Sequence, residues 1–243
     1  MTTLTAAKPL NRFSYVTFDV VGTLIDFEAA ITGALQKIAA DAGMTIDGEA
    51  ALAVYRNARY QPEALRFPDD LGRCYAQIAA ATGLPDTPEN RQFMIDAVGE
   101  AQPFADSVQA MARLKARYKL IAMTNARRWA FEKYQDKLGN PFWASFTTDD
   151  TGTEKPDPAF FHQVFDLVER DGASRDDILH TAQSQYHDIG ISRELGMTNA
   201  WIQRRHAQKG YGGTIEPAEF TTPDYHFHAL IELAEAADTA FGN

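Results

Sequence analysis

The segment FSYVTFDVVGTL, residues 13–24, contains a short run of β-branched and aromatic residues followed by a turn. The run from Phe13 to Phe18 predicts a β-strand. Gly22 and Thr23 predict a turn, so that Asp19 stands at the carboxyl end of this strand. In a parallel α/β sheet, ligands bind beyond the carboxyl ends of the strands. Asp19 is therefore the first candidate for a reactive side chain.

The sequence after this strand divides into two parts. Residues 27–102 show a helical pattern throughout, and we expect helices at 29–42, 48–60, 69–81 and 88–99. From residue 103 on, helices and strands alternate. The expected strands are 119–123, 143–147, 178–182, 198–202 and 225–229, and the expected helices are 106–117, 127–138, 158–170, 187–195 and 230–240. Residues 204–224 are expected to form a loop that contains Gly and Pro.

This alternation predicts the fold class. Strands separated by helices imply a parallel sheet with right-handed crossovers. We therefore expect an α/β protein with a doubly wound, Rossmann-like core formed by residues 1–26 and 103–243. Residues 27–102 would form an inserted helical cap over a cleft, which is a common place for a ligand site.

The composition limits the class of protein. Of 243 residues, 45% are hydrophobic, which is enough for a full core. The formal net charge of −10 argues against nucleic acid as a partner, because phosphate contacts need clustered Lys and Arg. Cys74 is the single cysteine, which excludes an intrachain disulfide. No apolar stretch resembles a signal peptide or a membrane span, so we expect a cytoplasmic protein without a membrane partner.

Four short motifs fall at the predicted strand ends. They are Asp19 with its Gly-Thr turn, Thr124-Asn125, Lys155-Pro156, and Gln183-Ser184-Gln185-Tyr186-His187-Asp188. Each motif alone also fits a structural role, as a capped turn, a helix cap or a surface loop. Because all four occur in order at the same edge of one sheet, the set indicates an active site.

This ordered set resembles the haloacid dehalogenase (HAD) superfamily, whose four motifs are an Asp loop, a Ser or Thr, a Lys and an acidic loop. The resemblance covers residues 13–202 and places the predicted helical insertion at the superfamily's cap position. It implies a hydrolase in which Asp19 is the nucleophile, Thr124 holds the bound anion, and Lys155 pairs with Asp19.

Two departures from the superfamily pattern bear on the reaction. Phosphatases of the superfamily carry a second Asp two residues after the nucleophile, and here that residue is Val21, which has no proton to give to a leaving alkoxide. Gln183 replaces an acidic metal ligand, which weakens a magnesium site. We therefore expect no cofactor and no metal ligands, with Mg²⁺ required only if the protein is a phosphatase. His162, His180, His206, His226 and His228 show no metal-like spacing.

The same departures resemble the L-2-haloacid dehalogenase (type II) branch. Thr124-Asn125 is similar to its second motif, and residues 183–188 match the length of its fourth. The branch carries a cap Arg after an aromatic residue; Arg56, which follows Tyr55, is the nearest match, and Arg59 is the rival. Two tyrosines of the branch are replaced here by Val21 and Phe161.

The resemblance implies a two-step displacement. Asp19 attacks carbon 2 of a small anionic (S)-2-halocarboxylate while Arg56 or Arg59 stabilises the leaving halide. The backbone amides around Val20, Val21 and Asn125, with Thr124, would hold the substrate carboxylate. Lys155 would keep Asp19 ionised. Water positioned by Asn125, Gln185 and Asp188 would then hydrolyse the ester. Ser184 and His187 of the fourth motif are the remaining expected substrate contacts, and the family suggests a homodimer.

Three alternatives remain at this point. The first is a hydrolase of the same branch with another small substrate, such as a strained-ring amino acid. The second is a Mg-dependent phosphatase; a phosphonate hydrolase is disfavoured because no Lys lies between Lys37 and Lys115 to form a Schiff base. The third is a non-enzymatic scaffold, which has no need for the four motifs.

Overall fold

The computed structural model describes residues 8–242, and its centre is one six-stranded sheet. The strands are β1 (Tyr15–Phe18), β2 (Lys119–Met123), β3 (Ala144–Phe146), β4 (Ile178–Ala182), β5 (Thr198–Ile202) and β6 (Tyr225–Phe227). Their order is β3-β2-β1-β4-β5-β6, and all neighbours pair in parallel. Every residue of β1 is buried, as expected for a strand covered on both faces.

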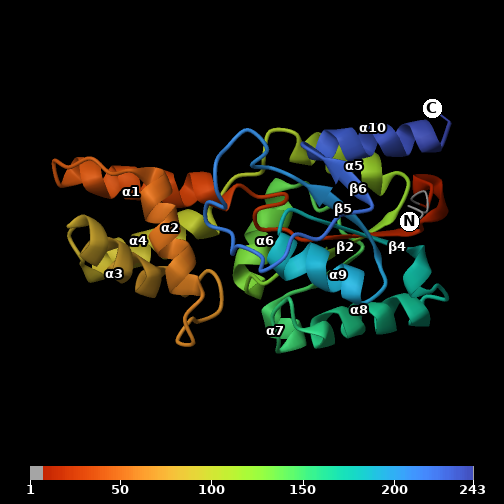
Figure 1. Ribbon diagram of the computed structural model, residues 1–243, viewed down its shortest axis with the longest axis horizontal. Helices are drawn as coiled ribbons and strands as arrows, with labels where there is room; N and C mark the ends of the chain where they lie inside the picture. The colour runs from red at the N-terminus through yellow and green to blue at the C-terminus, as the bar shows by residue number, and fades with distance from the viewer. Residues whose placement is uncertain (1–7, 243) are drawn as a thin grey trace.

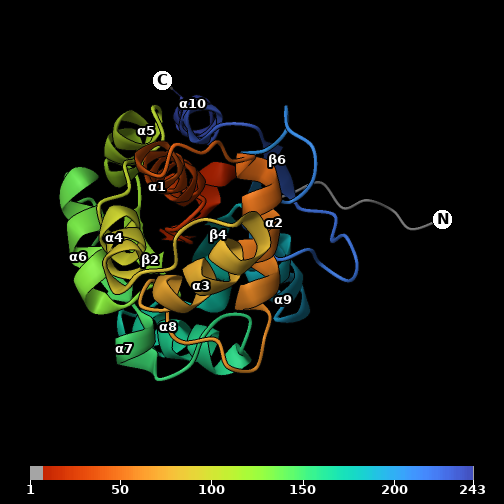
Figure 2. The same ribbon diagram turned by 90° about the vertical axis from the view of Figure 1, so that its left-hand side faces the viewer.

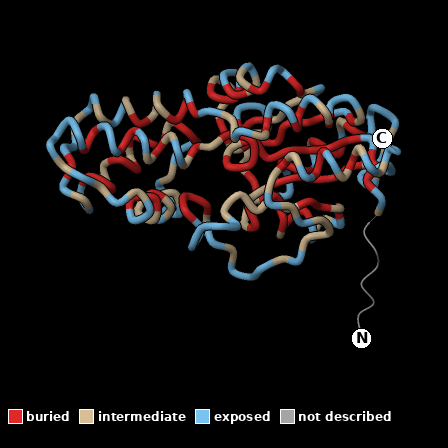
Figure 3. The backbone as a smooth tube through the Cα atoms, turned by 90° about the horizontal axis from the view of Figure 1, so that it is seen from above, coloured by how far each residue is buried: buried red, intermediate tan, exposed pale blue. Residues whose placement is uncertain are grey.

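Helices cover both faces of the sheet (Figure 1). One face carries α5 (Ser107–Lys115), α6 (Arg128–Lys137) and α10 (Leu230–Ala240), and the other carries α8 (Pro158–Arg170) and α9 (Gly190–Glu194). Side chains of β1 alternate between the two cores: Val16 and Phe18 pack with the first group, and Tyr15 packs with the second. Figure 3 shows buried residues running through the sheet and along the inner sides of these helices. The doubly wound α/β fold is confirmed.

Four helices between β1 and α5 form a separate bundle at one end of the molecule (Figures 1 and 2). They are α1 (Phe27–Asp41), α2 (Gly48–Arg59), α3 (Leu71–Thr82) and α4 (Pro88–Gly99). Each of the four packs on at least two of the others. We call residues 27–102 the helical block.

Local signals explain where these helices begin and end. The side chains of Asp26, Asp47 and Thr87 accept backbone amides at the starts of α1, α2 and α4. Gly83, in the left-handed conformation, ends α3. The amide of Asp26 donates to the carbonyl of Gln102 at 2.9 Å, so the two segments that enter and leave the helical block run side by side. The division into two domains at 26/27 and 102/103 stays a prediction.

The expected order of elements is confirmed, with local differences. α1 begins at Phe27, two residues before the expected start, because Asp26 rather than a later residue caps it. A short helix, α7 (Thr148–Thr151), was not expected and begins with a capping box between Thr147 and Asp150. The helix expected at 187–195 is a π-helical turn, η3 (Gln185–Ile189), followed by α9. Short 3₁₀ turns, η1 (Leu10–Arg12) and η2 (Arg175–Asp177), precede β1 and β4.

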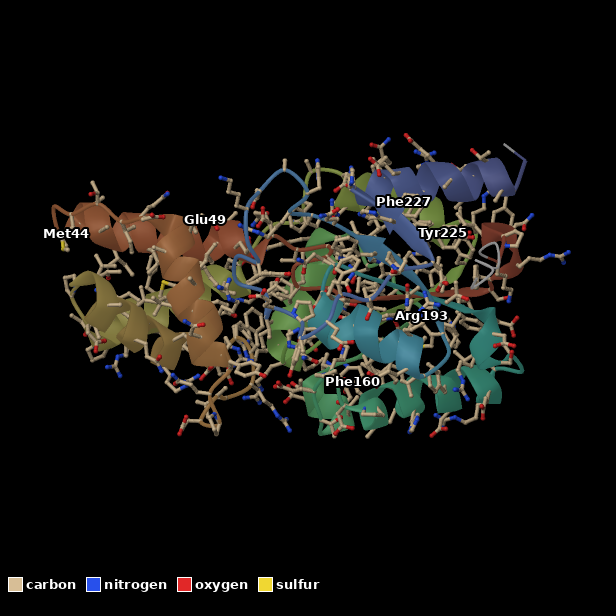
Figure 4. All side chains as sticks on the ribbon, viewed as in Figure 1. Met44, Glu49, Phe160, Arg193, Tyr225 and Phe227 are labelled. Atoms are coloured by element: carbon tan, nitrogen blue, oxygen red, sulfur yellow. The ribbon has the colours of Figure 1, made fainter. Side chains whose placement is uncertain are left out.

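Residues 203–224 contain no helix or strand, as expected for the loop between β5 and β6. This C-terminal loop lies against the helical block: the Arg205 guanidinium pairs with Glu28 of α1 and, at 2.7 Å, with Glu49 of α2. Figure 4 shows Glu49 at the start of α2, next to this loop. In the part of the chain that the structure describes, no helix is long and apolar enough to cross a membrane.

Candidate active site

A cavity of about 520 Å³ opens at the carboxyl edge of the sheet, between the sheet, the helical block and the C-terminal loop. Its walls come from the turn after β1, the loops after β2 and β3, the turn after β4, α1, α2 and the segment that follows α2, and the C-terminal loop. The lining residues are Asp19, Val21, Phe27, Tyr55, Arg59, Tyr60, Phe67, Asn125, Ala126, Glu154, Lys155, Pro156, Asp157, Gln183, Ser184, Tyr186, His187, Asp188, Gly213, Thr214 and Ile215. All four sequence motifs therefore contribute to one cavity.

Asp19 lies at the floor of the cavity, where β1 ends. Its amide still belongs to the sheet, since it donates to Thr181 at 3.0 Å, and the chain then turns at Gly22. Gly22 has a φ of +89°, and a Cβ there would stand 3.2 Å from the Phe27 ring, so this turn requires glycine. The hydroxyl of Thr23, at 2.6 Å, donates to Oδ2 of Asp19. The turn thus fixes the orientation of the carboxylate.

Lys155 bridges two carboxylates from different strands. Its Nζ lies 3.0 Å from Oδ1 of Asp19 and 2.6 Å from Oδ1 of Asp188, and its side chain is 1% exposed. Asn125 holds the backbone of Lys155: its Nδ2 donates to the Lys155 carbonyl at 2.8 Å, and its Oδ1 accepts the Lys155 amide at 2.7 Å. The structure brings Asp19, Asn125, Lys155 and Asp188 together, as the sequence predicted.

His180, to which the sequence pattern assigned no role, completes this group. It lies on β4, fully buried, with Nε2 3.1 Å from Oδ1 of Asp188 and Nδ1 2.8 Å from the Thr17 hydroxyl. An ionised carboxylate can only accept, so Nε2 carries a proton that it donates to Asp188. The Phe161 ring packs edge-on against His180 at 5.4 Å and does not line the cavity. The signal that could have revealed His180 is an imidazole in the middle of a strand whose residues are all buried.

Burial and these contacts set the charge of each group. Burial raises the pKa of Asp188, but Lys155 and His180 outweigh it and lower that pKa to about 2. Burial raises the pKa of Asp19 above its ordinary value, against the opposing effects of Lys155 and Thr23. Burial lowers the pKa of His187 to about 4. At neutral pH, therefore, Asp188 is ionised and His187 is neutral.

Unpaired backbone amides surround the Asp19 turn. Within residues 8–242, the amides of Val20, Val21 and Asn125 donate to no protein acceptor. Such amides at strand ends can bind an anion, as the sequence analysis predicted for a substrate carboxylate. The Val20 side chain is buried outside the cavity, and so is Thr124, whose Oγ1 accepts the Ala126 amide at 3.1 Å. For Thr124 this geometry matches a turn cap and does not place the hydroxyl in the wall.

Arg59, and not Arg56, lies in the cavity wall. The Arg56 guanidinium points to the C-terminal loop, where Nη1 donates to the Gly212 carbonyl at 2.7 Å. The preference for Arg56 over Arg59 as the residue that contacts the leaving group disagrees with this placement. Arg59 Nη1 donates to Oδ2 of Asp70 at 2.7 Å and to the Leu65 carbonyl at 2.5 Å, which holds its side chain in place.

The residues of the fourth motif separate into two groups. Ser184 and His187 line the cavity, and the Ser184 hydroxyl accepts the His187 amide at 2.9 Å and lies 3.1 Å from Nδ1 of the same residue. Gln185 does not line the cavity: its Oε1 accepts the Thr221 amide of the C-terminal loop at 3.1 Å. Its Oε1 faces the loop, whereas its buried Nε2 has no hydrogen-bond partner among residues 8–242, so the role of Gln185 in positioning water stays a prediction.

Several lining residues were not expected from the sequence. Glu154 precedes Lys155 in the wall, and the Tyr60 and Tyr186 rings approach edge to face at 6.3 Å from the helical block and the β4 turn. Gly213 and its neighbours reach the cavity from the C-terminal loop, where the Gly213 amide donates to Glu28 at 2.8 Å. No local sequence signal marks the loop residues, because only the folded chain brings the loop to this edge, whereas Tyr186 belongs to the fourth motif.

Magnesium is the metal that the sequence resemblance raises, and the residues present do not fit it. Of the acidic ligands that magnesium prefers, only Asp19 and Asp188 are at hand, and the Lys155 ammonium already takes one oxygen of each. Gln183 offers only a neutral amide, whose Oε1 accepts from Thr214 at 3.2 Å. In the described range 8–242, no group of three or more His, Cys, Asp or Glu side chains is arranged to hold a metal ion.

Comparisons with known proteins agree with the fold. A model of haloacid dehalogenase-like hydrolases matches residues 13–180. A search of curated proteins found no match. Among solved structures, an L-2-haloacid dehalogenase aligns with a TM-score of 0.74 at 21% identity, over 93% of this chain and 99% of the other.

Two further structures show the same fold. The L-2-haloacid dehalogenase from Xanthobacter autotrophicus aligns with a TM-score of 0.69 at 21% identity, over 93% of this chain and 98% of the other. YfnB from Bacillus subtilis, described as a HAD hydrolase and bound to magnesium, aligns with a TM-score of 0.73 at 19% identity, over 93% and 99%. At these identities the likeness establishes the shared fold.

Proposed function

Because this chain belongs to the haloacid dehalogenase-like hydrolases, we propose that it is a metal-independent dehalogenase of (S)-2-halocarboxylates. The observation that supports this most directly is the group formed by Asp19, Lys155 and Asp188. It offers a carboxylate nucleophile held by a buried ammonium, in a cavity whose wall at Val21 has no acid to protonate an alkoxide. A halide needs no proton to leave, and an alkoxide does.

In the first step, one oxygen of Asp19 attacks carbon 2 of the substrate and displaces the halide with inversion. The unpaired amides of Val20, Val21 and Asn125 hold the substrate carboxylate. Lys155 and the Thr23 hydroxyl orient Asp19, so that its attacking oxygen meets the carbon in line. The departing halide carries the charge that Asp19 loses on forming the ester.

Arg59, which lies in the cavity wall, is the cation that contacts the leaving halide in this proposal. Its attachment to Asp70 and the Leu65 carbonyl keeps the guanidinium in the wall. A fixed cation at the point where negative charge develops lowers the barrier without reorganisation.

In the second step, water attacks the carbonyl carbon of the Asp19 ester, and the bond from that carbon to the substrate oxygen breaks. One proton of the water passes to the hydroxyl of the product, and the other leaves through Asp188. Oδ2 of Asp188 is buried and has no hydrogen-bond partner in the described part of the chain, so it is available to accept from this water. The products are a 2-hydroxy acid and free Asp19.

The test is a single turnover in heavy-oxygen water with enzyme in excess over (S)-2-chloropropionate. The hydroxyl of the product should stay light, and one label should appear in the peptide that contains Asp19. Asp19→Asn should abolish turnover, because a neutral amide is a far weaker nucleophile. Asp157→Asn is the matched control, since Asp157 lines the same cavity but caps α8 and contacts neither Lys155 nor Asp188. A heavy hydroxyl in the first turnover would mean that water attacks the substrate directly.

A further inference from the structure

Glu154 is a carboxylate in the wall of the active-site cavity that the proposed reaction does not use. It immediately precedes Lys155 and lines the cavity. In the described residues its side chain makes no hydrogen bond and no ion pair with another residue, whereas Asp19, Asp70 and Asp188 are each paired with a cation. Glu154 is thus an unpartnered charge at a ligand site.

The nearby cations are committed to other carboxylates. Lys155 bridges Asp19 and Asp188, and Arg59 donates to Asp70 at 2.7 Å. Arg66, which does not line the cavity, pairs with Asp149 at 3.2 Å. Burial raises the pKa of Glu154, although Arg59 and Arg66 oppose that effect. A cation supplied by a ligand would stabilise the ionised form of this side chain.

The charge balance of the whole cavity also favours a ligand that carries a cationic group. Four carboxylates line it, and only two cationic side chains oppose them: the carboxylates are Asp19, Glu154, Asp157 and Asp188, and the cations are Arg59 and Lys155. His187 is neutral, since burial lowers its pKa to about 4. A simple haloacid would add a further negative charge, whereas a zwitterion would add none.

The size and chemistry of the walls leave room for a second group. A three-carbon haloacid has six non-hydrogen atoms, and the cavity of about 520 Å³ falls in the range that holds much larger ligands. Aromatic rings of Tyr55, Tyr60 and Tyr186 form part of the wall. The face of such a ring attracts an ammonium group, so a cavity that has both these aromatic rings and the Glu154 carboxylate in its wall suits a cation.

We propose that Glu154 binds a cationic group of the substrate, so that the preferred substrate is a zwitterionic 2-halocarboxylate with an ammonium group at the end remote from the reacting carbon. The carboxylate of this substrate lies at the amides after β1, and the ammonium lies at Glu154. This inference rests on the proposed dehalogenase function and specifies its substrate class.

The experiment compares two probes of the same length, 6-amino-2-chlorohexanoate and 2-chloroheptanoate, in which an ammonium replaces a methyl group. The selectivity is the ratio of the two kcat/KM values for chloride release. The wild-type protein should favour the amine, and Glu154→Gln should lower the selectivity about 10- to 100-fold, which corresponds to the loss of one charge-assisted contact. Glu154→Asp, which keeps the charge, should retain part of it.

Asp157→Asn is the matched control, because it removes the same charge from an exposed position in the wall. It should change the selectivity less than about two-fold, as expected for a charge screened by water. If Glu154→Gln and Asp157→Asn lower the selectivity equally, the preference arises from the overall negative charge of the cavity and not from a contact at Glu154, and the proposal is overturned.

Binding of halogen-free acids separates this inference from the proposed reaction. Calorimetry measures the affinities of wild type and of Glu154→Gln for 6-aminohexanoate and heptanoate. The ratio of these affinities gives the preference for the ammonium group without turnover. If chloride is released from 2-chloroheptanoate but neither selectivity nor relative binding responds to Glu154→Gln, this inference fails and the dehalogenase function stands. If the relative binding responds but no chloride is released from either probe, the dehalogenase function fails and the cation site stands.

Discussion

Replacing Lys155 with methionine tests the electrostatic centre of the site. The ammonium lies 3.0 Å from Asp19 and 2.6 Å from Asp188, and at an effective dielectric constant of about 20 each contact is worth about 5–6 kcal/mol. Desolvation of the three buried charges offsets most of this. Removal of one partner from a buried pair has a net effect of about 3–5 kcal/mol, because it leaves the remaining charges uncompensated.

This loss predicts two measurable changes for Lys155→Met. For a chain of this length, 1 kcal/mol corresponds to about 2–4 °C in Tm, so Tm should fall by roughly 6–20 °C in differential scanning calorimetry. The pKa of Asp19 should rise further, because its cation is gone and Asp188 remains beside it. At neutral pH, kcat/KM should fall about 100-fold or more, and part of that loss should return as the pH is raised.

Two further variants test whether the loss comes from the uncompensated charges at this site. Lys155→Met combined with Asp188→Asn removes one of the two facing charges, so it should recover most of the lost Tm but not the activity. Lys119→Met breaks the exposed pair with Asp171, and its Tm should change by no more than about 4 °C. A change of under about 2 °C for Lys155→Met, or additive losses in the double variant, would refute the bridging role of this ammonium.

Four other predictions follow from the site. Arg59→Ala should lower kcat/KM about 10- to 100-fold by removing one charge-assisted contact, and Arg56→Ala should have a smaller effect; the reverse order would restore Arg56 as the halide contact. Excess EDTA should leave the rate unchanged, and a loss that Mg²⁺ restores would assign the protein to the phosphatases. 2-Chloro and 2-bromo acids should react much faster than fluoroacetate, because Val21 supplies no donor to fluoride; equal rates for chloroacetate and fluoroacetate would contradict this. Since the pKa of Asp19 is raised above 3.8 and that of His187 is lowered to about 4, activity should be present at neutral pH and be lost as the pH falls through the raised Asp19 value. An inflection near 6.5 that disappears in His187→Asn would be inconsistent with a neutral imidazole.

The order of helices and strands could be predicted from the sequence because its signals are local. The apolar run of β1, the capping side chain of Asp47 and the left-handed Gly83 each act within a few residues. The approach of Asp19, Asn125, Lys155 and Asp188 was also predictable. A parallel sheet brings the carboxyl ends of its strands to one edge, so residues far apart in sequence meet there.

Only the tertiary structure decided which side chains of the helical block face the cavity. Arg56 and Arg59 lie within one turn of α2, and sequence spacing cannot tell which of them lines the cavity and which contacts the C-terminal loop. The packing of α2 against the loop decides it. The same holds for Gly213, which enters the wall because Glu28 holds the loop in place.

The charge environment likewise depended on long-range contacts. His180 and Glu154 belong to no motif, yet the first is positioned by Thr17 and Asp188, and the second forms no ion pair with any of residues 8–242. Whether a buried ionisable group is paired depends on groups brought close by strands and loops distant in sequence. A sequence pattern records residue types and spacing, whereas electrostatic pairing depends on distance in space, and this is why the sequence predicted the hydrolase family and the position of Asp19 but not the pairing of the charges around the cavity.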